Sequence, residues 1–172
     1  MGLSFILDGV VKMIVCVMGM MGNTISITLL LSAQLRNSFN KLLAILAVFD
    51  LIYLFTMTLD SLDNLGLETS LQTLMFPYFL YPLNSISLMC SIYMTLIVAL
   101  ERYMAVYNPL DYNRRQQDST SQRYHLINYV GPLIILAFLF NLTRFLESKV
   151  IYYSVGNDTK VDIDITALRL EK

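Results

Sequence analysis

The chain has 172 residues, of which 56% are hydrophobic, and its formal net charge at pH 7 is -1. Its mean hydropathy of +0.58 lies far above that of a soluble domain of this size. The slightly negative charge argues against a nucleic-acid-binding protein, and the hydropathy favours a protein embedded in a lipid bilayer.

Four apolar stretches are long enough to cross a bilayer, which takes about 20 mainly apolar residues. Four such helices, at this spacing, would leave no polar face to meet water. The predicted fold class is therefore an all-α membrane protein, with a single transmembrane domain over residues 1–172. Its helices are predicted at about 9–32, 41–60, 76–105 and 124–147.

Charged residues in the connections predict the orientation. The connection between the second and third helices, "LDSLDNLGLETSLQ", has three acids and no Lys or Arg. The connections on either side carry Arg36, Lys41, Arg102, Arg114, Arg115 and Arg123. Because basic loops stay in the cytoplasm, the amino terminus is predicted to be extracellular, in a multi-pass protein. The tail after the fourth helix then lies outside, where "NDT" makes Asn157 a predicted glycosylation site.

The sequence carries no motif that is typical of an enzyme. The single His125 has no metal-ligand spacing around it, and there is no phosphate-binding Gly loop or nucleophile elbow. Cys16 and Cys90 both lie inside predicted spans, where a small apolar packing role is expected. We therefore predict no enzymatic activity, no cofactor and no metal centre built from His or Cys.

Asp50 is the one acid well inside a predicted span. It lies about ten residues, or roughly 15 Å, from the end of the second helix, which is close to the middle of the bilayer. An ionisable residue at that depth faces protein or a water-filled cavity and is a functional candidate. The alternative is a neutral, hydrogen-bonded packing residue.

The third helix carries a polar stripe that points toward a partner surface. Its members recur at intervals of three, four, four and seven residues, which places them on one face: Asn84, Ser87, Ser91, Thr95 and Arg102. Small polar residues also serve as ordinary contacts between helices. The stripe ends in a charged pair, because Glu101 precedes Arg102 and is able to neutralise it locally. We expect this pair to exchange partners when neighbouring helices move.

Three motifs, in order on three helices, resemble those of rhodopsin-like (class A) G protein-coupled receptors. The first helix has "GN" at Gly22 and Asn23, and the second has "NKLLAILAVFDL" ending at Asp50 and Leu51. The third has "SIYMTLIVALERYMAVYNPL", with Ser91, the triplet from Glu101 to Tyr103, and Pro109. The resemblance covers roughly residues 9–150. It implies the first four helices of a truncated seven-helix bundle in the plasma membrane.

This resemblance implies roles for individual residues. Asn23, Asp50 and Ser91 would belong to a buried network of water and sodium, and a carboxylate facing a hydroxyl is a hard-oxygen cation site in outline. Any metal beyond a sodium ion at Asp50 is not expected. Arg102 would be the G-protein switch, pairing with Glu101 when inactive, and Tyr103 would frame the second intracellular loop. The implied partners are the lipid bilayer, a heterotrimeric G protein and an extracellular ligand.

A finer resemblance, to FMRFamide-receptor-like neuropeptide receptors, is carried by "YPLNSISLMCSIYMTLIVALERYMAVYNPL", "FNLTRFLES" and "DIDITALRL". It implies a peptide ligand. In such receptors the loop after the fourth helix commonly forms a hairpin over the ligand entrance. The alternating segments "KVIYYSV" and "KVDIDITALRL", with "GNDT" between them, predict a hairpin at about 149–169.

The sequence ends where a fifth helix would begin, so we expect an incomplete receptor that does not signal alone. Two alternatives stay open. One is a truncated membrane scaffold that pairs with full receptors and acts as a dominant-negative partner. The other is a transporter or channel fragment with Asp50 as an ion relay, although the helices reveal no internal repeat of the kind such folds usually show.

Overall fold

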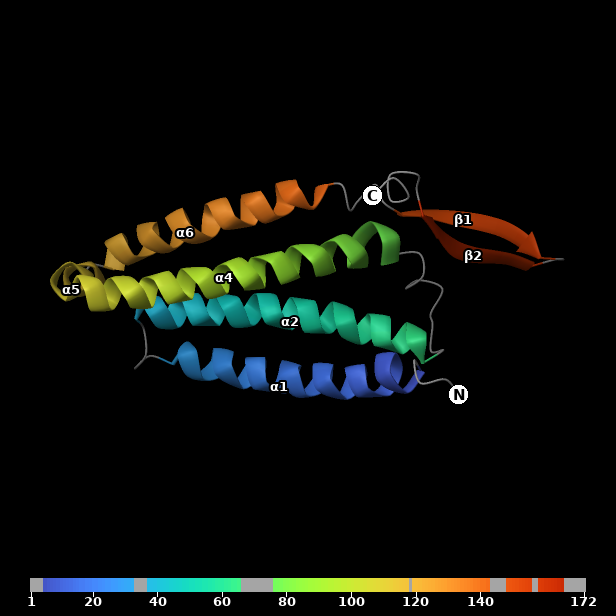
Figure 1. Ribbon diagram of the computed structural model, residues 1–172, viewed down its shortest axis with the longest axis horizontal. Helices are drawn as coiled ribbons and strands as arrows, with labels where there is room; N and C mark the ends of the chain where they lie inside the picture. Colours follow the sequence, from blue (N-terminus) through green and yellow to red (C-terminus); the bar gives the residue numbers. More distant parts are fainter. Residues whose placement is uncertain are drawn as a thin grey trace.

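The structure is a computed structural model that describes residues 5–32, 37–65, 76–117, 119–142, 148–155 and 158–165. Its long helices lie side by side, and two of them begin in a short π-helical segment (Figure 1). In chain order the elements are η1 (Phe5–Val11), α1 (Lys12–Leu30), α2 (Ser38–Asn64), η3 (Phe76–Leu80), α4 (Tyr81–Tyr107), α5 (Pro109–Gln117), α6 (Ser119–Phe140), β1 (Ser148–Val155) and β2 (Asp158–Ile165).

Three of the described helical segments are long and apolar enough to cross a membrane: Ile6–Leu30, Ser38–Leu62 and Tyr78–Tyr107. The prediction of a helical, multi-span membrane protein is therefore confirmed for these three. The fourth predicted span is also helical, but its apolar part, Leu126–Phe140, is shorter than the other three.

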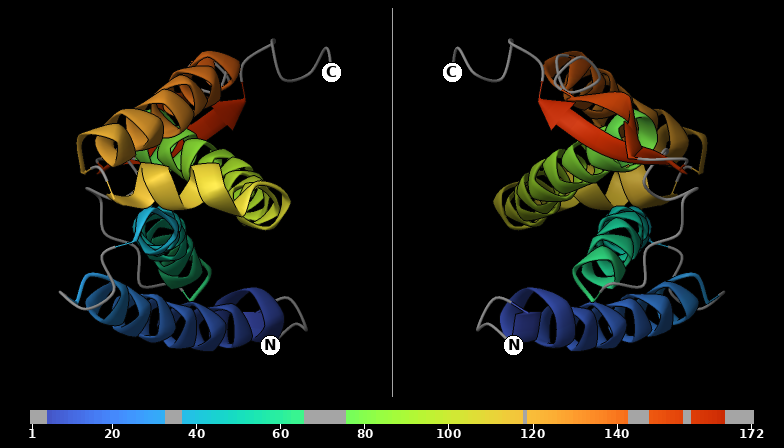
Figure 2. Two further views of the ribbon diagram at one scale, coloured as in Figure 1. Left: turned by 90° about the vertical axis from the view of Figure 1, so that its left-hand side faces the viewer. Right: turned by 90° about the vertical axis from the view of Figure 1, so that its right-hand side faces the viewer.

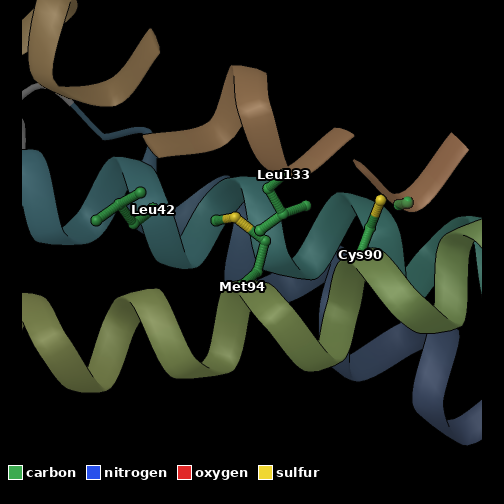
Figure 3. Close-up of a cluster of buried hydrophobic side chains, with 5 residues drawn as sticks. Leu42, Cys90, Met94 and Leu133 are labelled. Carbon is green, nitrogen blue, oxygen red and sulfur yellow. The ribbon is translucent and has the colours of Figure 1, made fainter. Parts of the chain in front are cut away.

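The long helices form successive layers, seen along their axes in Figure 2. Helix α2 packs between α1 and α4, and α6 packs mainly on α4. A small core joins the last three layers, because residues of α2, α4 and α6 meet there with almost no exposure (Figure 3). These residues are Leu42, Cys90, Met94, Leu133 and Ala137. Since α2 and α4 share this core, any polar side chains between them are held in a fixed geometry.

The π-helical start of the first helix is tied to the end of α2. The hydroxyl of Ser61 donates hydrogen bonds to the carbonyl oxygens of Gly9, at 2.5 Å, and Asp8, at 3.3 Å. One turn further along, Lys12 forms an ion pair with Asp60. These contacts supply partners for backbone and side-chain polar groups at the end of the two helices, where lipid offers none.

Helix α5 lies in the connection between the third and fourth long helices and was not predicted. Its start has a recognisable capping pattern: Asn108 precedes Pro109, and the Asn108 side-chain amide donates to the Asp111 carboxylate at 2.8 Å. Proline is favoured at the first helical position and an acid in the first turn. Asn-Pro-x-Asp was therefore a usable signal for a helix start.

The strands β1 and β2 pair in antiparallel register from Ser148 with Ile165 to Val155 with Asp158. They lie at the end of the helices where α1 begins (Figure 1), and β1 contacts η3. Residues 166–169 of the predicted hairpin range lie outside the described residues, as does the residue at its turn, Asn157.

Candidate functional site

The centre of the candidate site is a contact between Asp50 on α2 and Ser91 on α4. The Ser91 hydroxyl donates a hydrogen bond to the Asp50 carboxylate, and both side chains are partly buried. Asp50 lies near the middle of α2, so the contact forms deep within the helical layers. A carboxylate that accepts a hydrogen bond from a facing helix is stabilised where a lone one would be costly.

Asn23 on α1 lies close to this contact but is not joined to it. Its side-chain amide donates to the Gly19 carbonyl of its own helix at 3.1 Å. Asn23 and Asp50 both line a cleft of about 380 Å³ between α1 and α2. Apart from Ser26, the other lining residues are apolar: Leu29, Leu30, Leu43, Leu46 and Ala47. The three predicted network residues thus lie in one region, with a hydrogen bond recorded between Asp50 and Ser91 and none between Asn23 and either.

The remaining stripe residues of α4 make different contacts. Ser87 is buried and donates to the Leu83 carbonyl at 2.6 Å, and the exposed Thr95 donates to the Ser91 carbonyl at 3.0 Å. The Asn84 amide nitrogen lies 4.0 Å from the sulfur of Met57 on α2. The Asn84 side-chain oxygen is buried without a hydrogen-bond partner. The hydroxyls of Ser87 and Thr95 therefore find hydrogen-bond acceptors within α4, whereas the side-chain oxygen of Asn84 accepts no hydrogen bond.

The charged pair at the other end of α4 is split between two environments. Glu101 is 7% exposed, whereas Arg102 is exposed. The guanidinium carbon of Arg102 lies 3.4 Å from the centroid of the Phe39 ring at the start of α2. The structure records no ion pair between Glu101 and Arg102. Tyr103 is exposed and stacks on Tyr107, with ring centroids 5.7 Å apart.

Comparison with known proteins identifies the family to which these residues belong. The sequence model of the "7 transmembrane receptor (rhodopsin family)" matches residues 22–153. This chain belongs to the rhodopsin family of seven-transmembrane receptors. The match includes Asn23, Asp50, Ser91 and the triplet that begins at Glu101, so the resemblance drawn from these motifs is confirmed.

Two relatives are similar to this rhodopsin-family chain over most of its length. The "FMRFamide peptide receptor frpr-18" of Caenorhabditis elegans is 31% identical over 152 residues, which are 84% of this chain and 34% of that protein. The "FMRFamide receptor" of Drosophila melanogaster is 30% identical over 159 residues, which are 88% of this chain and 28% of that protein. The resemblance to FMRFamide receptors is thereby confirmed. The chain spans about a third or less of the length of these curated relatives.

The sequence also led to predictions for the cysteines, for metal binding and for glycosylation. Cys16 and Cys90 are free and buried, as expected of apolar packing residues. Among the described residues, no group of three His, Cys, Asp or Glu side chains could hold a metal ion. The predicted glycosylation residue, Asn157, lies outside the described residues. A second glycosylation pattern, "NLT", begins at Asn141. The Asn141 side chain is buried, and its amide donates to the Ala137 carbonyl at 2.7 Å, so it is not available for a sugar.

The sequence interpretation missed two contacts. One is the ion pair of Lys12 with Asp60, for which a signal existed: Lys12 precedes Asn23 by 11 residues and Asp60 follows Asp50 by 10. In neighbouring antiparallel helices, these offsets place opposite charges at the same depth. The other is the contact of Phe39 with Arg102, for which no sequence pattern exists, because aromatic residues are common at the membrane ends of helices.

Proposed function

We propose that this chain is part of a G protein-coupled receptor for an extracellular neuropeptide, which transmits ligand binding to a heterotrimeric G protein. The observation that carries the proposal is the Asp50–Ser91 contact at mid-depth, in a rhodopsin-family chain whose two relatives are named as FMRFamide receptors. An acid kept inside a membrane domain by a facing hydroxyl is expected where helices change their packing in response to a signal.

In this receptor, Asp50, Ser91 and Asn23 take part in a network of water and sodium. The carboxylate and the hydroxyl are oxygen donors of the kind that hard cations prefer, and two helices hold them together. They are too few for a full coordination sphere, so water or further receptor residues would complete it. A bound ion would add positive charge beside the carboxylate, and the chain's own residues would hold it at the α2–α4 contact.

The G-protein switch consists of Glu101, Arg102 and Tyr103 at the inner end of α4. Support comes from Arg102, which is exposed as a residue, and from large apolar side chains in the turns that follow it, which are also exposed. Val106 is 83% exposed, Tyr107 73% and Leu110 76%. A cation next to an uncovered apolar surface is suited to docking an amphipathic helix of a protein partner.

The peptide ligand binds at the opposite end, near the start of α4. The buried, unpartnered oxygen of Asn84 supports this proposal, because a buried acceptor without a donor costs free energy that a ligand N–H would recover. In this proposal the β1–β2 hairpin covers the entrance to that site, and the contact of β1 with η3, just before α4, supports this. Ser87 and Thr95 line the same polar stripe further inward.

In the plasma membrane, the receptor crosses the bilayer with α6 as its fourth span and with its amino terminus outside. The start of α1, the hairpin and Asn157 then face the extracellular side.

We expect the chain expressed in animal cells to carry one N-linked sugar, which Asn157→Gln removes. The measurement is the gel mobility before and after treatment with a glycosidase. Asn141→Gln is the matched control and should not change the mobility, since Asn141 is buried. An unglycosylated wild-type chain, together with protease-accessible basic loops on intact cells, would refute this orientation.

The receptor function is tested in two steps. The transcript downstream of Lys172 is sequenced, and the complete reading frame is expressed in cells with a reporter of G-protein activation and a panel of amidated neuropeptides. Peptide-dependent activation that is lost in Arg102→Ala supports the proposal. If the reading frame stops at Lys172 and the chain instead co-precipitates with a full-length receptor and suppresses its response, the dominant-negative partner replaces it.

A further inference from the structure

The side chain of Arg102, the exposed charged residue of the proposed switch, lies over an aromatic ring. Its guanidinium carbon is 3.4 Å from the centroid of Phe39, within van der Waals contact of the ring face. Phe39 is the second residue of α2, and its side chain is partly buried. A guanidinium in this position is attracted by the negative face of the ring.

Helix geometry explains why Glu101, the acid next to Arg102 in the sequence, does not pair with its guanidinium. Successive residues of an α-helix point about 100° apart, so adjacent side chains do not face each other. Glu101 points into the packed interior, with 7% exposure, and Arg102 points toward the start of α2. Among the described residues, neither a hydrogen bond nor an ion pair is recorded for the Glu101 carboxylate. The contact that Arg102 does make is with Phe39.

We propose that Phe39 is the positioning residue for Arg102: its ring face holds the guanidinium against the inner end of α2. Helix α2 then restrains the switch through an aromatic face, in place of a carboxylate. Release of Arg102 requires a movement of α4 relative to the start of α2, because Phe39 is fixed on the latter. The meaning of this restraint for signalling rests on the proposed receptor function, but the contact itself does not.

The test measures how fast phenylglyoxal modifies Arg102 in the purified chain in lipid nanodiscs, with mass spectrometry to resolve each arginine. Replacing Phe39 with leucine keeps an apolar side chain and removes the ring face. We expect Phe39→Leu to raise the modification rate of Arg102 about two- to fivefold, in line with an exposed cation–π contact. Arg114, which is also exposed, serves as the internal reference and should not change.

Three further variants separate the ring face from other causes. Phe55→Leu is the matched control, since it makes the same exchange at an exposed position of α2 that is about 24 Å along the helix. Phe39→Trp should restore or exceed the protection. Phenylalanine analogues with increasing fluorine content at position 39 keep the shape of the ring and weaken the negative charge on its face. The modification rate of Arg102 should therefore rise stepwise with the number of fluorine atoms.

An unchanged rate in Phe39→Leu, or a flat response to fluorination, would overturn the proposal. A Glu101→Gln variant that raises the rate more than Phe39→Leu would also overturn it, because it would make the acid the main restraint. The readout needs neither peptide nor G protein. If Phe39→Leu raises the modification rate but the signalling assay fails, the receptor function is contradicted and the Arg102–Phe39 contact is supported. If the signalling assay succeeds but the modification rate does not change, the contact is contradicted and the receptor function is supported.

Discussion

Reversing one charge of the Lys12–Asp60 pair is expected to destabilise the membrane-embedded fold strongly. Lys12→Asp places two carboxylates side by side between α1 and α2, where the native side chains are only 26% and 32% exposed. Breaking a buried ion pair costs about 3–5 kcal/mol and an exposed one about 0–1, so we expect a loss of about 2–4 kcal/mol in the free energy of unfolding. The measurement is thermal unfolding followed with a maleimide dye, because Cys16 and Cys90 are buried in the native state.

The double reversal, Lys12→Asp with Asp60→Lys, tests whether the loss belongs to the pair. It should regain most of the stability, because opposite charges again meet at the same depth. Asp60 has a further interaction in the structure, so recovery will be incomplete. The comparison with Asp60→Lys alone gives the coupling free energy of the pair. Additive losses in the double variant would contradict a direct ion pair.

The second large effect is expected at Asp50. If sodium binds beside its carboxylate, the thermal midpoint of the chain will rise with sodium chloride but not with choline chloride at equal ionic strength. At a sodium concentration about tenfold above the dissociation constant, mass action stabilises the folded state by about 1.4 kcal/mol. Asp50→Asn removes the charge but keeps a hydrogen-bond acceptor for Ser91, so we expect it to abolish the sodium response.

Ser91→Ala separates the hydrogen bond from the ion. It removes a bond to a charged group, worth about 1.5–3 kcal/mol, and should lower the stability in both salts. Ser87→Ala is the matched control on the same helix, since its hydroxyl donates to the Leu83 carbonyl within α4. A wild-type chain that responds equally to sodium and choline would refute the sodium site. A Ser87→Ala loss as large as that of Ser91→Ala would refute a special role for the α2–α4 contact.

Hydropathy predicts the long helices of this receptor because, in lipid, a segment must satisfy its own backbone hydrogen bonds. It is less informative about where they end. Helix α2 was expected to stop near residue 60, where apolar residues give way to acids and hydroxyls, but it continues to Asn64. There, Asp60 finds a partner at the start of α1 and Ser61 finds one in η1, so these polar residues do not need water. Tertiary contacts thus override the local pattern.

For the candidate site, the sequence predicted which residues lie there better than it predicted which side chains they contact. Motif spacing placed Ser91 on the polar face of the third helix, and the family resemblance implied that it shares a network with Asp50; its hydroxyl donates to the Asp50 carboxylate. Motif spacing also placed Arg102 on the inward stripe beside Glu101, whereas the structure sets Arg102 against Phe39. Spacing along one helix gives the direction of a side chain, but which neighbour it meets depends on how far the other helix extends. That information is absent from a periodic pattern.

The close fit of α1 on α2 has a consequence for how the protein enters the membrane during synthesis. A Cβ atom at Gly19 would lie 2.9 Å from a side-chain methyl of Leu54, so the missing side chain of Gly19 leaves the space that Leu54 fills between the two helices. A lysine on a lone helix opposes insertion by about 2.5–3.5 kcal/mol at mid-depth, and less toward the interface. Lys12 escapes part of this penalty only once Asp60 has emerged from the ribosome. The first two helices are therefore suited to leave the translocon as a hairpin, with the second one completing the integration of the first.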